Sequence, residues 1–215
     1  MQKLVIICVL KSGGDYGLAY VNKLKQMLIR HTTLPYEFIC LTDLEIPSSL
    51  CKSIKLQDGF PGWWSKIELF RKGLVEADRI VYFDLDTVIL DNIDELLQRD
   101  EYFIGLRPFN PKRMKNPNLF GSGIMSWEND GMLSFIYEEF KKYMTQWFKG
   151  DQAYIAWKLK EKGVLLSFWQ SLVSGVYSYK RRCVKGLPED AKIVCFHGCP
   201  RLPQVKKQWV KENWK

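Results

Sequence analysis

The sequence has no hydrophobic run long enough to cross a bilayer. Its longest continuous apolar stretch, Leu4 to Leu10, is far too short for a membrane-spanning helix. The small-residue cleavage site of a secretory signal is also absent, and no Asn-x-Ser/Thr sequon occurs anywhere in the chain. These absences predict a cytoplasmic protein without a signal peptide or a transmembrane segment.

The six cysteines form no Cys-x-x-Cys pair. Cys8 and Cys40 lie inside apolar, strand-like runs, where a thiol behaves as a small hydrophobic side chain. We therefore expect a reducing compartment and no disulfide framework. Cys195, His197 and Cys199 are close in sequence, but three ligands without a fourth argue against a structural zinc site.

Positive charge exceeds negative charge. The chain has 32 Lys and Arg residues against 24 Asp and Glu, a net charge of +8. Such a surface favours anionic partners, including nucleotides, acidic glycans and the head groups of a membrane contacted peripherally. A solvated face remains the simpler interpretation of each basic cluster, at Lys112 to Lys115, Lys180 to Arg182, and Lys206 and Lys207. No nucleic-acid partner is expected, because no helix concentrates basic residues and no aromatic–basic RNA-binding signature occurs.

Apolar patterns alternate between strand and helix periodicity. Continuous or alternating apolar runs predict strands at 3–10, 36–43, 79–83, 102–106, 123–127 and 191–196. Apolar residues at helical spacing predict a helix beginning at Leu18 and others over 65–76, 132–148 and 152–161. This alternation predicts a single α/β domain over residues 1–215, with a mostly parallel sheet flanked by helices.

Polar segments follow four of the predicted strands. In open α/β sheets, ligands bind outside the carboxyl ends of the strands. "KSGGDYG", "TD", "DLD" and "HGCPR" occupy these positions. We therefore expect the four segments to meet at one edge of the sheet.

Asp84 and Asp86 form an acid pair after the third predicted strand. Residues i and i+2 of a strand project to the same side, so the two carboxylates share a face while Leu85 points away. Two carboxylates this close repel unless a cation joins them, and hard oxygen ligands suit Mn²⁺ or Mg²⁺. Such a cation would also bind the oxygens of a nucleoside diphosphate. A solvated strand end without a task is the alternative.

The segment "FDLDTV" also fits the signature of haloacid-dehalogenase-type phosphatases, in which Asp84 would be phosphorylated. That fold expects the motif on its first strand, followed by a Gly-Asp-x-x-x-Asp cluster. Here the motif comes later, and Ile155 stands where the second acid of the cluster is expected. Both departures argue against a phosphatase.

Five segments, in order, resemble the GT-A-fold glycosyltransferases that use a nucleotide-sugar donor and a DxD motif: "GWWSKIELF", "VYFDLDTVI", "FGSGIMSW", "GDQAYI" and "VCFHGCPRLP". The similarity is greatest to the family-eight-like group and its small bacterial and viral relatives, and it extends to about residue 205. It implies a GT-A fold and metal-dependent transfer of a sugar, most often from a UDP-sugar. The acceptor would be a hydroxyl of a glycan or other molecule. The resemblance implies that anomeric configuration is retained; in the alternative, an inverting enzyme, Asp151 is the candidate base.

The resemblance assigns roles on the donor side. Asp84 and Asp86 match acids that bind the metal and the ribose, and Lys66 matches a basic position that contacts the donor. "KSGGDYG" resembles the loop that covers the nucleoside, where glycines allow close backbone approach and a tyrosine face can stack on a base. Its candidate residues are Lys11, Asp15 and Tyr16. An exposed helix lysine and a plain strand-to-helix turn are the alternative interpretations.

Two further segments match the sugar and acceptor side. "FGSGIMSW" resembles the segment lining the sugar pocket, with Gly121, Ser122 and Gly123 against the donor; a turn leading into a strand would look the same. "GDQ" resembles the acceptor-side pair near the anomeric carbon, Asp151 and Gln152. Asp151 would also suit a helix N-cap.

The segment "FHGCPR" resembles a C-terminal loop that closes over the diphosphate. It implies His197 as a metal ligand, with Gly198 and Arg201 binding phosphate oxygens. Some relatives carry a histidine at the position of Cys195, so either His197 takes the metal or that ligand is missing. A non-catalytic nucleotide- or glycan-binding module remains an alternative to the enzyme.

Overall fold

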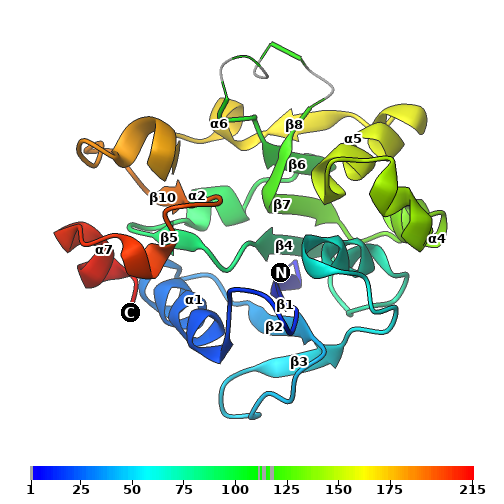
Figure 1. Ribbon diagram of the computed structural model, residues 1–215, viewed down its shortest axis with the longest axis horizontal. Helices are drawn as coiled ribbons and strands as arrows, with labels where there is room; N and C mark the ends of the chain where they lie inside the picture. The colour runs from blue at the N-terminus through cyan, green and yellow to red at the C-terminus, as the bar shows by residue number, and fades with distance from the viewer. Residues whose placement is uncertain (1, 111, 113–114, 117–118) are drawn as a thin grey trace.

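A seven-stranded mixed sheet forms the centre of the computed structural model, which describes residues 2–110, 112, 115–116 and 119–215 (Figure 1). Its spatial order is β3-β2-β1-β4-β7-β6-β8. The strands are β1 (Leu4–Leu10), β2 (Glu37–Thr42), β3 (Lys52–Lys55), β4 (Arg79–Phe83), β6 (Phe103–Leu106), β7 (Gly121–Glu128) and β8 (Leu166–Phe168). Only β7 runs antiparallel to its neighbours, β4 and β6, so the sheet is mostly parallel, as predicted.

A second, three-stranded sheet has the order β5-β10-β9. It contains β5 (Thr87–Ile89), β9 (Val176–Ser178) and β10 (Ile193–Cys195). Because β5 starts four residues after β4 ends, the two sheets meet at the turn over residues 84–86. The sequence patterns missed β3, β5, β8 and β9, and the acid pair therefore follows the fourth strand of the chain rather than the third.

Helices cover both faces of the central sheet. Figure 1 shows α1, α7 and the small sheet on one side, and η1, α4 and α5 on the other. The α-helices are α1 (Leu18–His31), α2 (Asp94–Leu97), α4 (Phe135–Glu138), α5 (Asp151–Glu161), α6 (Trp169–Leu172) and α7 (Gln208–Asn213). The 3₁₀-helices are η1 (Gly62–Phe70), η2 (Met132–Ser134), η3 (Lys142–Gln146) and η5 (Leu202–Gln204), and η4 (Tyr179–Cys183) is a π-helix. Among the described residues, none of the helices has the length and apolarity that crossing a bilayer requires.

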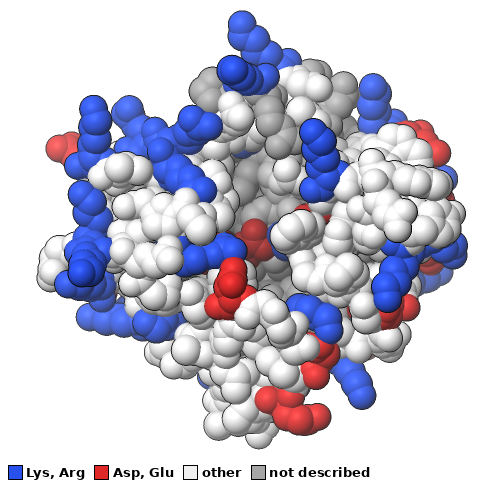
Figure 2. Space-filling model, viewed as in Figure 1, with Lys and Arg blue, Asp and Glu red and all other residues white. Residues whose placement is uncertain are grey.

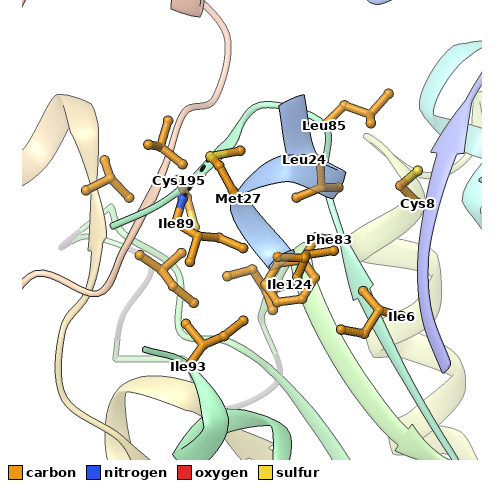
Figure 3. Packing of buried hydrophobic residues seen from close by; sticks show 14 of the residues in the cluster. Ile6, Cys8, Leu24, Met27, Phe83, Leu85, Ile89, Ile93, Ile124 and Cys195 are labelled. Carbon is orange, nitrogen blue, oxygen red and sulfur yellow. Dashed lines mark hydrogen bonds between the residues drawn. The ribbon is translucent and has the colours of Figure 1, made fainter. Parts of the chain in front are cut away.

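Successive side chains of β1 point to opposite faces of the sheet, and the core is accordingly divided into two clusters. Ile6 and Cys8 point into one cluster, under α1 and the small sheet, while Val5 and Ile7 point into the other, under η1 and α5. Figure 3 shows the first cluster, where the backbone N–H of Ile89 donates to the sulfur of Met27 at 3.3 Å. Burial on both faces explains why β1 is apolar throughout.

Two predicted helices are wrong. The 3₁₀-helix η1 (Gly62–Phe70) overlaps only the first half of the segment 65–76, and the segment 132–148 forms three short helices instead of one. The backbone is extended at Arg71 and at Lys141, and Gly73 takes a left-handed φ of 70°. Apolar residues beyond these breaks reach the core from loops, so helical spacing alone does not reveal the interruption.

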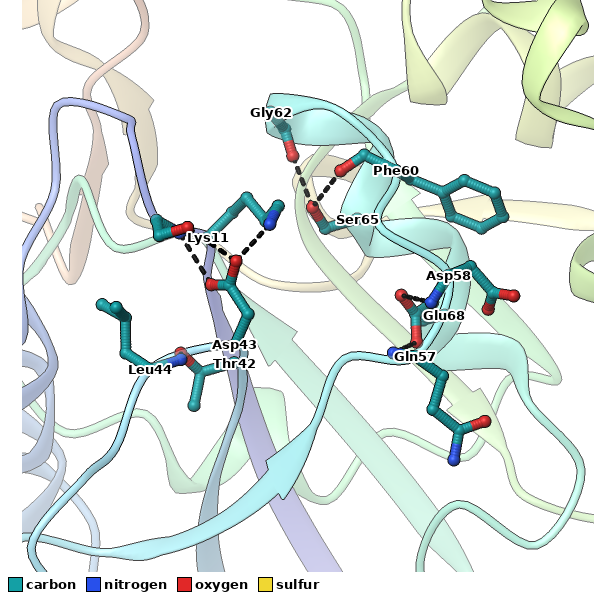
Figure 4. A network of polar contacts seen from close by, with 11 residues as sticks. Lys11, Thr42, Asp43, Leu44, Gln57, Asp58, Phe60, Gly62, Ser65 and Glu68 are labelled. Atoms are coloured by element: carbon teal, nitrogen blue, oxygen red, sulfur yellow. Dashed lines mark hydrogen bonds and ion pairs between the residues drawn. The ribbon is translucent and has the colours of Figure 1, made fainter.

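A buried carboxylate anchors η1 to the preceding loop (Figure 4). Glu68 is fully buried and accepts hydrogen bonds from the backbone N–H groups of Gln57 at 2.7 Å and Asp58 at 3.2 Å. The guanidinium of Arg71 lies 3.2 Å from the same carboxylate. These contacts fix the helix that carries Lys66.

Glu68→Ala should lower the free energy of unfolding by about 2–4 kcal/mol, because two backbone donors and a guanidinium lose their buried acceptor. Urea denaturation measures the change. The matched control is Glu76→Ala, since Glu76 pairs with Lys3 only at the surface and its side chain is 97% exposed. Equal stability of the two variants would contradict this account of η1.

Candidate active site

The acid pair lies in the turn that joins the two sheets. The backbone N–H of Asp84 donates to the carbonyl of Gly123 at 2.8 Å, and that of Phe196 donates to the carbonyl of Asp86 at 3.0 Å. The pair is therefore in a turn rather than on a strand. The two carboxylates still share one face while Leu85 points away, as predicted. Leu85 is buried in the first core cluster, and both acids face the same cavities.

Two cavities meet at this turn. Cavity 1 has a volume of about 740 Å³ and cavity 2 about 390 Å³. Both are lined by Lys66, Asp84, Asp86, Phe196 and His197. The remaining predicted residues divide between them, with Gly121, Ser122, Gly123, Asp151 and Gln152 in cavity 1, and Lys11, Asp15, Tyr16, Gly198 and Arg201 in cavity 2. Figure 2 shows this hollow near the centre of the face, with acidic atoms inside it.

Lys66 is buried between two carboxylates. Its Nζ lies 2.8 Å from Asp84 Oδ1 and 3.6 Å from Asp151 Oδ2, and the hydroxyl of Ser122 donates to Asp151 Oδ2 at 2.5 Å. Burial lowers the pKa of Lys66, but the charges of Asp151 and Asp84 raise it more, so the net pKa lies above the ordinary lysine value. Lys66 is thus a charged group inside the site, and the exposed-lysine alternative is wrong.

Asp84 is held by neighbours on both sides. Oδ1 accepts a hydrogen bond from the hydroxyl of Tyr82 at 2.5 Å, a contact that the sequence did not reveal. A side chain at position 123 would crowd the other oxygen, because its Cβ would lie 3.3 Å from Asp84 Oδ2 and from the side chain of Leu106. Gly123 therefore allows the carboxylate to approach β7.

Asp86 has weaker compensation for its charge. It is 5% exposed, and its Oδ2 accepts a hydrogen bond from the hydroxyl of Tyr16 at 2.7 Å, while the guanidinium of Arg201 lies 3.7 Å away. Burial and then the charge of Asp84 raise the pKa of Asp86 to about 7. Two oxygen-donor side chains with an excess of negative charge, facing one cavity, suit a divalent cation.

The loop after β1 and the loop after β10 are joined by one side chain. Arg201 donates from Nη1 to the hydroxyl of Tyr16 at 2.8 Å and from Nη2 to Asp15 Oδ2 at 2.5 Å. Gly198, with a left-handed φ of 68°, leaves space for Lys180, whose Nζ would lie 3.1 Å from an added Cβ. The two loops predicted to cover a donor are therefore in contact.

His197 lies in both cavities but does not contact the acids. Its Nε2 is 2.7 Å from Ser178 Oγ, and its ring stacks on Phe109 with centroids 5.9 Å apart. Among the described residues, no three His, Cys, Asp or Glu side chains come close enough together to hold a metal ion. Metal binding by Asp84, Asp86 and His197 stays a prediction.

Lys11 forms an ion pair with Asp43, which also accepts a hydrogen bond from the backbone N–H of Ser12 at 2.8 Å (Figure 4). Burial alone would raise the pKa of Asp43, but the bonds from Lys11 and Ser12 lower it to about 2. Asp43 belongs to the "TD" segment, so its position after a strand was visible in the sequence while its partner was not.

Several lining residues of cavity 1 were not predicted as site residues. They come from the segment after β6 and from η4: Arg107, Phe109, Asn110, Lys180 and Arg181. The basic cluster at 180–182 was noticeable in the sequence, but its place beside the cavity depends on how η4 packs against the small sheet. The cluster at 112–115 lies partly outside the described residues.

No protein-family model matches the chain, and no curated protein matches it in sequence. Solved structures do match. The galactosyltransferase LgtC, in complex with donor and acceptor sugar analogues, gives a TM-score of 0.69 at 12% identity over 94% of this chain and 90% of LgtC. The chain has a GT-A-like glycosyltransferase fold. A second structure with this fold, the glycosyltransferase GlyE of Streptococcus pneumoniae, gives 0.67 at 13% identity; the match covers all of this chain but 62% of GlyE.

The raised pKa of Asp86 predicts how stability depends on pH without ligand. Between the ordinary carboxyl pKa and about 7, the folded protein holds a proton on Asp86 that the unfolded chain has lost, so stability falls as pH rises. Asp86→Asn removes this contribution. The free energy of unfolding of the variant minus that of wild type should rise by on the order of 2–4 kcal/mol between about pH 4 and pH 7.5.

Urea denaturation in metal-free buffer across this pH range measures the difference. Subtracting the two proteins cancels the other titrating groups. A difference that stays constant with pH would show that Asp86 ionises normally in the folded state.

Proposed function

We propose that the chain transfers a sugar from a nucleotide-sugar donor of the UDP-sugar class to a hydroxyl of a glycan or other acceptor. The observation that carries the proposal is the position of Asp84 and Asp86 between two connected cavities, at the carboxyl end of β4. One cavity has room for a nucleoside and the other for a sugar with its acceptor. LgtC, which has the same fold, was solved with analogues of both substrates.

Cavity 2 would receive the nucleoside. The rings of Tyr16 and Trp63 line it, and Trp63 is 60% exposed, so an aromatic face is available for a base. Arg201 lies beside both Tyr16 and the acid pair, and its two nitrogens match the spacing of phosphate oxygens. Release from Asp15 would free one of these nitrogens for the diphosphate.

Cavity 1 would receive the sugar. The carboxylate of Asp151 and the hydroxyl of Ser122 face it, and Lys66 holds this carboxylate in place. Asp151 already has two partners, so we assign it to positioning the sugar rather than to taking the acceptor's proton. This assignment supports retention of anomeric configuration, since an inverting enzyme needs a free base on the acceptor side.

Asp84 and Asp86 would hold Mn²⁺ or Mg²⁺, with His197 as a third ligand after exchanging its bond to Ser178. A cation held by these residues would supply positive charge next to the departing diphosphate. The protein's own contribution is to exclude water through the loops joined by Arg201, which favours transfer over hydrolysis.

The fold argues against the phosphatase alternative, because the acid pair follows a central strand in a glycosyltransferase-like sheet. A non-catalytic binding module has the same cavities and must be distinguished by turnover.

UDP with Mn²⁺ should raise the melting temperature by about 2–5 °C, and either one alone should have a smaller effect. Differential scanning fluorimetry measures this shift for wild type, Asp84→Asn and the matched control Asp100→Asn, whose carboxylate is exposed and away from both cavities. The shift should disappear in Asp84→Asn and should remain in wild type and in Asp100→Asn. Stabilisation by oligonucleotides without metal would favour a nucleic-acid binder instead.

Asp86→Asn should lower Mn²⁺-dependent cleavage of UDP-sugars by at least about 100-fold while the protein stays folded. A panel of UDP-sugars, with release of UDP as the signal, measures this loss. Turnover equal to that of wild type would eliminate the proposed role of the pair, and phosphate release from a generic phosphoester would revive the phosphatase.

A further inference from the structure

A third cavity adjoins cavity 1 through shared lining residues. Cavity 3 has a volume of about 340 Å³ and is lined by the segment after β6, by the segment from α6 to β9, and by η4. It shares Arg107, Pro108, Phe109 and Arg181 with cavity 1. It shares no described residue with cavity 2. A molecule that extends out of cavity 1 past Arg107 and Arg181 would therefore enter cavity 3.

The walls of this cavity carry an excess of positive charge. Arg107, Arg181 and Arg182 line it, and none of them forms an ion pair with any residue that the structure describes. Asp190 is the one acidic residue among the described lining residues, and both of its oxygens accept from the hydroxyl of Tyr177, at 2.9 and 2.8 Å. Figure 2 shows Lys and Arg side chains gathered over this part of the chain.

Arg107 is already held in position. Its Nη2 donates to the hydroxyl of Ser171 at 2.7 Å, its backbone N–H donates to Gln170 Oε1 at 2.8 Å, and its guanidinium lies 4.6 Å from the centroid of Phe168. A guanidinium fixed in this way loses little freedom when it binds, and its remaining donors fit the paired oxygens of a phosphate or carboxylate. Arg181 and Arg182, which are exposed on η4, add two further cations around the same space.

We infer that the acceptor is an anionic sugar, and that Arg107, Arg181 and Arg182 bind its phosphate or carboxylate group in cavity 3. This inference rests on the proposed function for its assignment of an acceptor, but the anion site itself can be tested without turnover. The donor diphosphate does not explain these residues, because Arg107 and Arg182 are absent from cavity 2 and Arg182 is absent from cavity 1.

The test is isothermal titration calorimetry with three probes that differ in charge: glucose, glucose 6-phosphate and glucuronate. The protein variants are Arg182→Ala, Arg107→Ala and the control Lys185→Ala, which removes an exposed positive charge outside all three cavities. Each titration is run with and without UDP and Mn²⁺, because occupied donor sites prevent a sugar phosphate from binding there instead.

At least one anionic probe should bind wild type and Lys185→Ala more tightly than glucose does. The affinity for that probe should be about tenfold or more lower in Arg182→Ala and in Arg107→Ala. Preference between the two anions identifies phosphate or carboxylate as the recognised group. The inference is overturned if neither anion binds better than glucose, or if Arg182→Ala, an exposed substitution that spares the fold, binds as wild type does.

The result separates this inference from the proposed function. Failure of UDP to bind would contradict the nucleotide-sugar donor, yet arginine-dependent binding of the anions without UDP would still establish the site. Normal UDP binding without arginine-dependent anion binding would contradict the anionic acceptor alone.

Discussion

The buried ammonium of Lys66 connects the parts on which the site depends. It comes from η1 and lies beside Asp84, in the turn between the two sheets, and beside Asp151, at the start of α5. A buried charge is costly unless it is paired, so the lysine and the two acids can be accommodated only together. This requirement holds together three segments that are distant in sequence, and it places their charged groups in the lining of cavity 1.

The charges of Asp84 and Asp86 are compensated to different extents, because Lys66 lies close to Asp84. Asp84 has Lys66 and the hydroxyl of Tyr82 as close partners, whereas Asp86 has a neutral tyrosine hydroxyl and a guanidinium 3.7 Å away. Asp86 therefore carries most of the unfavourable effect of burial and repulsion. A binding site often has such an uncompensated group, since the ligand supplies the missing charge. The asymmetry is physical support for a cation at this turn, beyond the presence of two acids.

The sequence predicted the central strands better than it predicted the edge strands and the helices. β1, β2 and β4 are continuous apolar runs because they are buried, but β3 is polar and mostly exposed, and β5 and β9 have only three residues each. The segments after β1, β4 and β10, which the rule that ligands bind after strands had selected, do contribute residues to two joined cavities. Asp43, Tyr82 and the arginines of cavity 3 could not be predicted, because their relevance comes from contacts across distant segments.

The three cavities are joined by shared lining residues. The acid pair lines the proposed nucleoside and sugar cavities, and the arginines line cavity 3, two of them at its boundary with cavity 1. The central claim is that Asp84 and Asp86 bind a divalent cation together with a nucleoside diphosphate. A crystal structure of the protein with Mn²⁺ and UDP tests it most directly. We expect an anomalous manganese signal in contact with both carboxylates and with diphosphate oxygens, and the uracil beside Tyr16 in cavity 2. Manganese or UDP bound away from both carboxylates would contradict the account.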